Sequence, residues 1–184
     1  MEANEKKLRQ NNATEKNAES IEFVETLLNV RRVAKVVRGG RRFGFSALVV
    51  VGDKNGKVGL ALGKGREVST AIAKAFKRAR KVLVTVPRFN DTIPYTIVGE
   101  YGASKVVLRG ATKGTGIIAG GAMRTIFEAA GIKDILAKSI GSSNPQNVAK
   151  ATFAAFGSLR SAGHLAKLRG KTVAELIEGS NVGA

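Results

Sequence analysis

The stretch R-R-V-A-K-V-V-R-G-G-R-R, Arg31–Arg42, decides the fold of the N-terminal half of this chain. Six of its twelve residues are Arg or Lys, and none is acidic. Its valines favour an extended strand. Gly39 and Gly40 would end that strand, because glycine accepts positive φ and lets a ligand approach the backbone. Arginines on both sides of a glycine turn suit phosphate groups, although a solvated basic edge strand is the plainer alternative.

The charge around this stretch is concentrated in one part of the chain. The whole sequence of 184 residues has a net charge of +17, and residues 29–90 contribute 16 basic and two acidic side chains. Residues 1–28 are slightly acidic, and residues 91–184 are only moderately basic. Such localisation indicates a module that binds a polyanion, because an evenly basic surface would mostly serve solubility.

Composition excludes several classes of protein. No run of eighteen apolar residues exists, so we expect no membrane span. The N-terminus lacks the apolar core of a signal peptide, and the absence of cysteine favours an intracellular location. The single histidine, His164, cannot form a histidine metal site alone, so we expect no metal and no catalytic triad.

The pattern upstream of the glycine turn is simple. Residues 1–20 are polar, which predicts a mobile arm. Ile21–Leu28 is predicted to form a short helical turn. From Val30 the pattern changes to strand, and apolar residues alternate with small ones over 43–51, which predicts a strand with at least one buried face.

A second hairpin and a helix follow. Asn55-Gly56 is a strong hairpin signal, and Lys57–Leu62 should form the returning strand. Gly63–Arg66 is a second basic glycine loop, and Val68–Val84 shows a helical stripe. Residues 21–90 are therefore predicted to form a β-β-β-α domain, in which one helix covers a three-stranded antiparallel sheet.

The second half mixes strands with helices, which predicts a small α/β domain over residues 91–162 in a protein of the α+β class. Prolines 87 and 94 bracket the predicted boundary. Residues 163–184 form a tail, in which Thr172 and Glu175 match a capping box. The predicted strands are Tyr95–Tyr101, Lys105–Arg109 and Lys133–Ile140, and the predicted helices are Ala122–Ala130, ended by Gly131, and a segment from Pro145, capped by Asn144, to Leu159.

One motif favours a different function. Gly114–Ala119 matches the dinucleotide fingerprint G-x-G-x-x-A, with Asp134 about twenty residues further on. The loop from Gly110 to Gly121 is too long for the tight turn of that motif, and the region is too small for two nucleotide-binding halves. We therefore expect no cofactor and no enzymatic activity, and a nucleotide-dependent oxidoreductase is the rival hypothesis.

Aromatic residues are scarce, at 5% of the chain. Proteins that bind single strands need aromatic stacking platforms. Phe43 and Phe45 could supply one, but their alternation with small residues suits a core face better. The sequence therefore predicts phosphate and sugar contacts on folded RNA, and a free regulator that binds double-stranded RNA is a third hypothesis. The candidate RNA-binding residues are Arg31, Arg32, Lys35, Arg38, Gly39, Gly40, Arg41, Arg42, Lys54, Lys57, Lys64, Arg66, Lys74, Arg78, Lys81, Lys113 and Arg124.

Several long motifs in order resemble the family of bacterial small-subunit ribosomal protein five, over roughly Phe23 to Ile177. They include R-V-A-K-V-V-R-G-G-R-R-F at Arg32–Phe43, V-V-G-D-K-N-G-K-V-G at Val50–Gly59, G-K-G-R-E-V at Gly63–Val68, G-T-G-I-I-A-G-G-A-M-R at Gly114–Arg124, L-A-K-S-I-G-S-S-N-P-Q-N at Leu136–Asn147 and R-G-K-T-V at Arg169–Val173.

The resemblance implies a domain like a double-stranded-RNA-binding fold without its first helix, followed by a βαβ-type domain with a left-handed crossover. It implies a cytoplasmic protein, a structural constituent of the small subunit, that binds rRNA near the neck and lies close to mRNA at the entry channel. It also implies support for assembly and decoding accuracy, and no homo-oligomer. The loop matching Val36–Arg42 would reach the neck, where changes can confer spectinomycin resistance.

The resemblance also implies contacts with ribosomal proteins four and eight. Ser104, Lys105 and Arg109 lie where the family meets protein four. Two departures fall nearby: Gly102-Ala103-Ser104 stands where the family commonly has Thr/His-Gly-Ser, and Gly110 stands where it commonly has Pro.

Overall fold

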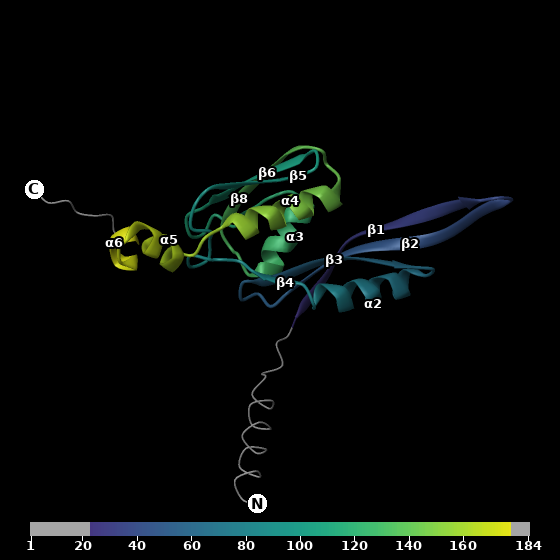
Figure 1. Ribbon diagram of the computed structural model, residues 1–184, viewed down its shortest axis with the longest axis horizontal. Coiled ribbons are helices and arrows are strands. Elements are labelled where there is room, and N and C mark those ends of the chain that lie inside the picture. Colours follow the sequence, from purple (N-terminus) through teal and green to yellow (C-terminus); the bar gives the residue numbers. More distant parts are fainter. Residues whose placement is uncertain (1–22, 178–184) are drawn as a thin grey trace, which may run out of the picture.

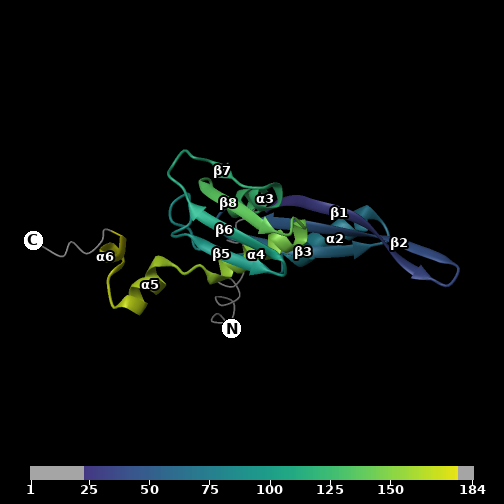
Figure 2. The same ribbon diagram turned by 90° about the horizontal axis from the view of Figure 1, so that it is seen from above.

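The computed structural model describes residues 23–177, which form two four-stranded sheets and five helices (Figures 1 and 2). The first sheet has the order β1-β2-β3-β4 and is antiparallel throughout; the second has the order β5-β6-β8-β7. This arrangement confirms the α+β class and the two-part organisation. The strands are β1 Val24–Val37, β2 Gly40–Gly52, β3 Lys57–Gly65, β4 Leu83–Thr85, β5 Ile97–Tyr101, β6 Ser104–Gly110, β7 Ile117–Ile118 and β8 Ile135–Gly141, and the helices are α2 Val68–Ala79, α3 Gly121–Ala130, α4 Pro145–Ser158, α5 Ala162–Arg169 and α6 Val173–Ile177.

The first sheet is covered on both faces along only part of its length. On one face, Val49 and Val51 of β2 pack against Ala75 and Ala79 of α2. On the other face, Val50 joins a larger core shared with the second half of the chain. Both faces of β2 are therefore apolar here, which is why the alternation in this segment gives way to a continuous valine run.

Beyond this covered part, β1 and β2 extend as a bare hairpin (Figure 2). The pairing of β2 with β3 ends at Phe45, so the hairpin has only two strands from Val33 to Gly44. Five residues in each strand give it a reach of about 17 Å. Gly39 occupies the turn with φ +86°, a conformation that favours glycine, whereas Gly40 has an ordinary φ and continues into β2. Of the two glycines predicted to end the strand, only Gly39 uses the positive φ that glycine accepts.

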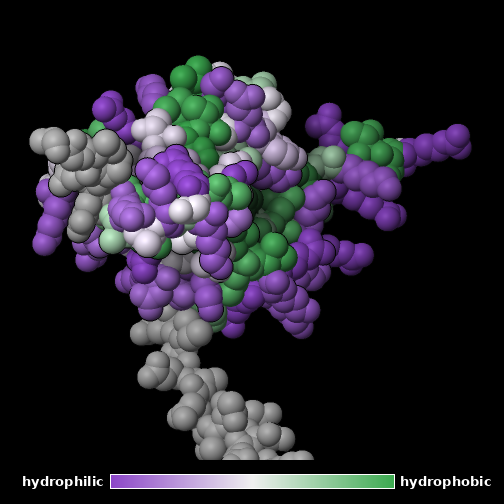
Figure 3. Space-filling view, turned by 60° about the vertical axis from the view of Figure 1, so that its left-hand side comes forward, coloured by the Kyte–Doolittle hydropathy of each residue, from purple (hydrophilic) through white to green (hydrophobic). Residues whose placement is uncertain are grey.

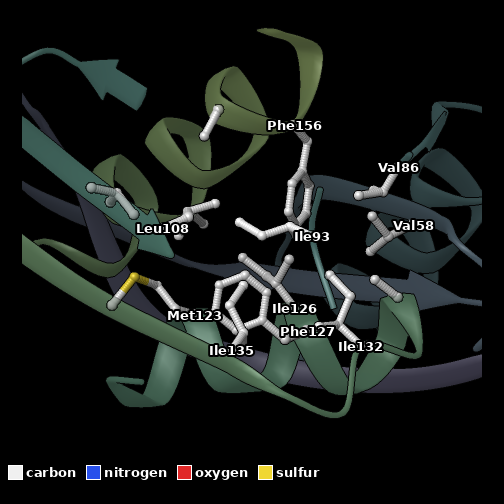
Figure 4. Close-up of a cluster of buried hydrophobic side chains, with 14 of the residues drawn as sticks. Val58, Val86, Ile93, Leu108, Met123, Ile126, Phe127, Ile132, Ile135 and Phe156 are labelled. Carbon is white, nitrogen blue, oxygen red and sulfur yellow. The ribbon is translucent and has the colours of Figure 1, made fainter. Parts of the chain in front are cut away.

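The second sheet has helices on one face only. Both α3 and α4 pack on the face that carries Val106 and Leu108, where they enclose the largest core of the protein (Figure 4). Phe127 of α3 and Phe156 of α4 meet edge to face, with ring centroids 6.0 Å apart. Within residues 23–177, no helix covers the opposite face of this sheet.

A tight contact joins the two halves. The backbone N–H groups of Lys54 and Gly56, in the β2–β3 turn, donate hydrogen bonds to the carbonyls of Ala129 and Ala130 at 3.0 Å each. These carbonyls belong to the last turn of α3, which has no partner for them within the helix. Gly131 ends α3 in the left-handed conformation, and a Cβ there would collide with the Lys54 carbonyl.

Several predicted boundaries are confirmed. The Asn55-Gly56 turn joins β2 to β3, and Gly131 ends α3. Asn144 caps α4, because its side chain accepts a hydrogen bond from the N–H of Gln146, and Pro145 follows at the first helical position.

The predicted capping box in the tail is confirmed as well. The N–H of Thr172 donates to Glu175 Oε2, and the N–H of Glu175 donates to the Thr172 hydroxyl. The backbone hydrogen bond from Thr172, followed by that residue's side-chain hydrogen bond, lowers the pKa of the Glu175 carboxyl from its ordinary value.

Three predictions in the first half are wrong. Leu27 and Leu28 lie in β1 and not in a helical turn, because Leu27 pairs with Val49 of β2 and Leu28 occupies a register shift in the same strand. The segment Gly63–Gly65 is the end of β3 and not a loop. Helix α2 ends at Ala79, and the L-V-T sequence at Leu83–Thr85 instead pairs with the free edge of β3, which makes the sheet four-stranded.

Two differences appear in the second half. The glycine-rich segment contains a short strand, β7, which pairs in parallel with β8, and the tail contains an additional helix, α5. The crossover from β7 to β8 passes through α3, and its handedness stays a prediction. The predicted arm at residues 1–20 lies outside the described residues, and the domain boundaries also stay predictions.

Gly131→Ala tests the contact between the halves. The added methyl group would meet the Lys54 carbonyl and must adopt a φ of +75°, so we expect a loss of about 2–4 kcal/mol in the free energy of unfolding. Urea denaturation of the purified chain measures it. Gly157→Ala is the matched control, because its Cβ would lie in open space within α4 and should not destabilise the protein. Equal stability of the two variants would contradict the importance of this contact.

Candidate nucleic-acid interface

The projecting hairpin concentrates positive charge. Arg31, Arg32 and Lys35 on β1, and Arg41 and Arg42 on β2, are all exposed, and Arg38 stands at the turn. Residues 30–46 contain no acidic side chain, and none of these six cations forms an ion pair with a described residue. Their charge is therefore available to a ligand.

A shallow hollow of about 540 Å³ lies beside the hairpin, between its strands and the beginning of α2. Five of the predicted RNA-binding residues line this hollow, which brings together side chains from four elements and the β3–α2 link. They are Lys35, Arg42, Lys64, Arg66 and Lys74. Because Lys64 lies at the end of β3 and not in a loop, its position is fixed by pairing with Ser46 of β2.

Phe43 lies on the surface, at 53% exposure, and lines the same hollow. The prediction that it faces the core is wrong, because α2 and the third strand do not reach this part of β2. The Arg32 guanidinium carbon lies 4.7 Å from the centroid of the Phe43 ring, within the range of a cation–π contact. Alternation in the sequence gives the face of a residue but not the length of the element that covers it.

The remaining predicted RNA-binding residues form separate groups. Arg78 and Lys81 are exposed, on α2 and just after it, and Arg78 also donates a hydrogen bond to the Leu62 carbonyl. Lys54 and Lys57 lie at the opposite end of β2, about 40 Å along the strand from the hairpin turn. The structure does not bring these two lysines to the hairpin.

Lys113 and Arg124 flank the glycine-rich loop of the second half. Arg124 donates a hydrogen bond to the Ile117 carbonyl at 2.8 Å, so its guanidinium group already supports the loop. Lys113 lies beside a smaller hollow near Asp91 and Asp134. These two cations therefore form a second surface, distinct from the hairpin.

The loop itself is organised by Asp134, a role that the sequence pattern did not reveal. This buried carboxylate accepts hydrogen bonds through Oδ1 from the N–H of Gly114 at 3.1 Å and of Gly116 at 2.8 Å. In a dinucleotide site the glycine amides would meet a pyrophosphate and the acid would meet a ribose hydroxyl. Here these groups bind each other, so the residues do not fit a dinucleotide.

The predicted protein-contact residues differ in their surroundings. Ser104 is buried, and its hydroxyl donates to the Ser142 carbonyl at 2.8 Å, so its side chain does not fit a surface contact. Lys105 is exposed and pairs with Glu100 at 2.7 Å. Arg109 is exposed beside an apolar hollow of about 330 Å³.

This hollow belongs to the uncovered face of the second sheet, which we call the open sheet face. Cross-strand partners share a face of a sheet, so the pairing assigns its members. Arg109 pairs with Leu136, and Lys105 pairs with Ile140. The open sheet face comprises Val98, Glu100, Lys105, Val107, Arg109, Ile118, Leu136, Lys138 and Ile140.

Within residues 23–177, no group of three or more acidic or histidine side chains could hold a metal ion. Among the helices of this part of the chain, none is long and apolar enough to cross a membrane.

Comparison with known proteins agrees with this geometry. The model of the family described as "Ribosomal protein S5, N-terminal domain" matches residues 23–87, and that of "Ribosomal protein S5, C-terminal domain" matches residues 99–169. The chain is also 56% identical over 149 residues to the small ribosomal subunit protein uS5 of Lawsonia intracellularis, which covers 81% of this chain and 91% of that protein. The chain belongs to the ribosomal protein S5 family.

Other S5 relatives show similar agreement. The uS5 protein of Syntrophobacter fumaroxidans is 53% identical over 156 residues, which cover 85% of this chain and 94% of the relative. The uS5 protein of Nitrosococcus oceani is 50% identical over 166 residues, which cover 90% of this chain and 98% of the relative. The S5 family is a structural, non-enzymatic part of the small ribosomal subunit, a cytoplasmic particle.

The S5 loop around Asp134 yields a direct test. Asp134→Ala removes the acceptor for two amides, so we expect faster hydrogen exchange at Gly114 and Gly116 and a loss of about 1–3 kcal/mol in the free energy of unfolding. Exchange followed by NMR measures the first effect and urea denaturation the second. Asp134→Asn is the control, because it keeps one acceptor oxygen and should lose less. Unchanged exchange in the Asp134→Ala protein would contradict this role.

Proposed function

We propose that this chain binds small-subunit rRNA through the β1–β2 hairpin and the neighbouring end of α2, near the neck of the subunit and the mRNA entry. The observation that carries the proposal is the hairpin itself, which extends past the third strand. Together with Arg31 and Arg32 at its base, it presents six cations with no ion-pair partner among the described residues. A bare two-stranded hairpin is marginally stable alone. RNA phosphates bound to the exposed surface of the hairpin would stabilise it, and the hairpin would in turn fix the position of the RNA.

The charge pattern favours contact with the RNA backbone. The hairpin presents cations on both of its faces. The cross-strand partners Lys35 and Arg42 share one face, and Arg32 and Arg41 lie on the other. Such an arrangement supports insertion between RNA segments. We propose that it brings these segments together during assembly, which is the structural role.

We further propose that the open sheet face contacts ribosomal protein four, that protein eight is a second neighbour, and that these contacts support decoding accuracy. The support is a set of exposed apolar side chains, with Val98, Ile118 and Ile140 each exposed by more than two fifths, beside the charged Arg109. Apolar surface rimmed by charge is typical of protein interfaces.

The salt dependence of binding tests the rRNA proposal. With several phosphates neutralised, log K for transcribed small-subunit rRNA should fall with log salt with a slope steeper than about −4. The double variant Lys35→Gln/Arg42→Gln should make this slope shallower by about 1.4–1.8, because each lost phosphate contact contributes about 0.7–0.9. Filter binding at several salt concentrations measures both slopes.

Lys138→Gln serves as the matched control, because it removes one cation from the open sheet face. Its slope should equal that of the unmodified protein. A nearly flat salt dependence would contradict the proposal. Equal affinity for rRNA and for a generic RNA duplex would instead favour a free regulator that binds double-stranded RNA.

The open sheet face is tested in cells. Arg109→Leu removes an exposed cation, so a strain carrying only this variant should assemble subunits yet change its frequency of stop-codon readthrough. A change of about 1–2 kcal/mol in one contact can shift a two-state equilibrium several-fold. Arg160→Leu, between α4 and α5, is the control and should leave readthrough unchanged. Normal readthrough in both strains would oppose a role of this face in decoding.

Ser104→Leu belongs to a different class of variant. Because Ser104 is buried and bonded to the Ser142 carbonyl, its replacement should lower the stability of the whole protein. A readthrough effect of Ser104→Leu would therefore not by itself identify a contact surface.

A further inference from the structure

The hairpin carries an apolar cluster among its charges. Its members are Val36 and Phe43, which are 74% and 53% exposed and lie diagonally across the two strands on one face of the hairpin. Val33, which is 43% exposed, lies on the opposite face. Figure 3 shows apolar side chains on the projecting hairpin surrounded by hydrophilic ones. Phosphate contacts do not explain this cluster, because apolar groups gain nothing from a phosphate. A bound group that covers the Phe43 ring would gain the free energy of removing this apolar surface from water.

The ring is held in a defined position. Arg32 lies over it at 4.7 Å, and Ala34, its cross-strand partner, leaves the ring unobstructed because it is small. A cation over one part of the ring fixes its orientation without covering all of it, and half of the side chain stays exposed. Phe43 is therefore a prepared planar surface at the edge of the hollow.

The rest of the hollow selects the chemistry of the ligand. Five cations line it, and no acidic residue does. Arg66 precedes α2 and Lys74 belongs to α2, the helix on the Phe43 face of the sheet, whereas the register places Lys35, Arg42 and Lys64 on the opposite face. Its volume of about 540 Å³ falls in the range of sites for small organic groups. A ligand that fits must be flat and apolar on one side and anionic on another, which describes a nucleotide.

We propose that this hollow binds a single unpaired RNA nucleotide, whose base stacks on Phe43 while its flanking phosphates meet Arg66 and Lys74. The inference rests on the proposed rRNA-binding function and adds that part of the recognised RNA is unpaired. A base inside a continuous duplex offers only its edges, so it cannot cover the ring. An acidic peptide would satisfy the cations but would leave the ring exposed.

Binding to matched RNA hairpins tests the proposal with the full chain. Four RNA hairpins each contain one unpaired nucleotide, A, C, G or U, and a fifth is fully paired. Because stacking on an aromatic ring tolerates every base, the unmodified protein should bind the four bulged hairpins about tenfold or more tightly than the paired one. Phe43→Leu should remove this preference and leave the affinity for the paired hairpin and the salt slope unchanged.

Two controls accompany this experiment. Phe89→Leu removes another exposed phenylalanine, one between the two sheets, and should keep the preference for bulged RNA. A hairpin whose unpaired nucleotide is 2-aminopurine reports stacking directly, because its fluorescence is quenched when the base stacks. The unmodified protein should quench this fluorescence and Phe43→Leu should not. This comparison of two proteins uses a single RNA, so it does not depend on differences between hairpins.

The outcomes separate this inference from the function on which it rests. Equal affinity of the unmodified protein for bulged and paired hairpins, or the same preference and quenching in Phe43→Leu, would overturn the nucleotide site while leaving rRNA binding intact. Failure to bind any of the hairpins or the transcribed rRNA would overturn both. Circular dichroism tests whether the Phe43→Leu protein is folded. If that variant does not fold, the presence or absence of 2-aminopurine quenching by the unmodified protein decides whether an unpaired base stacks.

Discussion

The junction between α3 and the β2–β3 turn is the constraint on which the two halves of the molecule depend. A helix leaves its last carbonyls unsatisfied, and here the amides of Lys54 and Gly56 satisfy two of them. The contact works only because Gly131 turns the chain into the left-handed region next to the Lys54 carbonyl. Around it, Val58 from the first half joins the same core as Phe127 and Ile132. Two small sheets thereby share one continuous interior.

This shared interior fixes the geometry of the two candidate surfaces. The hairpin projects from one end of the first sheet, and the open sheet face belongs to the second sheet (Figure 1). If the halves moved freely, RNA held by one would not position a partner held by the other. Because the buried side chains of both halves interlock, an interaction at the hairpin constrains the orientation of the open sheet face.

The sequence predicted local features well, since short-range chemistry determines them. Asn144 and Pro145 specify the start of α4, and Asn55-Gly56 specifies the β2–β3 turn. It failed where a distant segment decides. Leu83–Thr85 became a strand because β3 offered a free edge, and Phe43 remained exposed because α2 does not extend over it. The burial of a strand residue depends on which other element covers it, and the periodicity of the sequence carries no information about that element.

The same lesson applies to the glycine-rich loop, where one pattern allows two opposite interpretations. Glycine amides and an acid about twenty residues apart can hold a dinucleotide between them, or they can hold each other. The sequence spacing is identical in both cases. The deciding quantity is the distance from Asp134 Oδ1 to the N–H of Gly116, which at 2.8 Å leaves no room for a phosphate between them. A carboxylate that reaches its own loop makes a self-supporting turn, and one that does not leaves the amides free for a cofactor. Here Asp134 reaches the loop because β8, which follows it, pairs with β7.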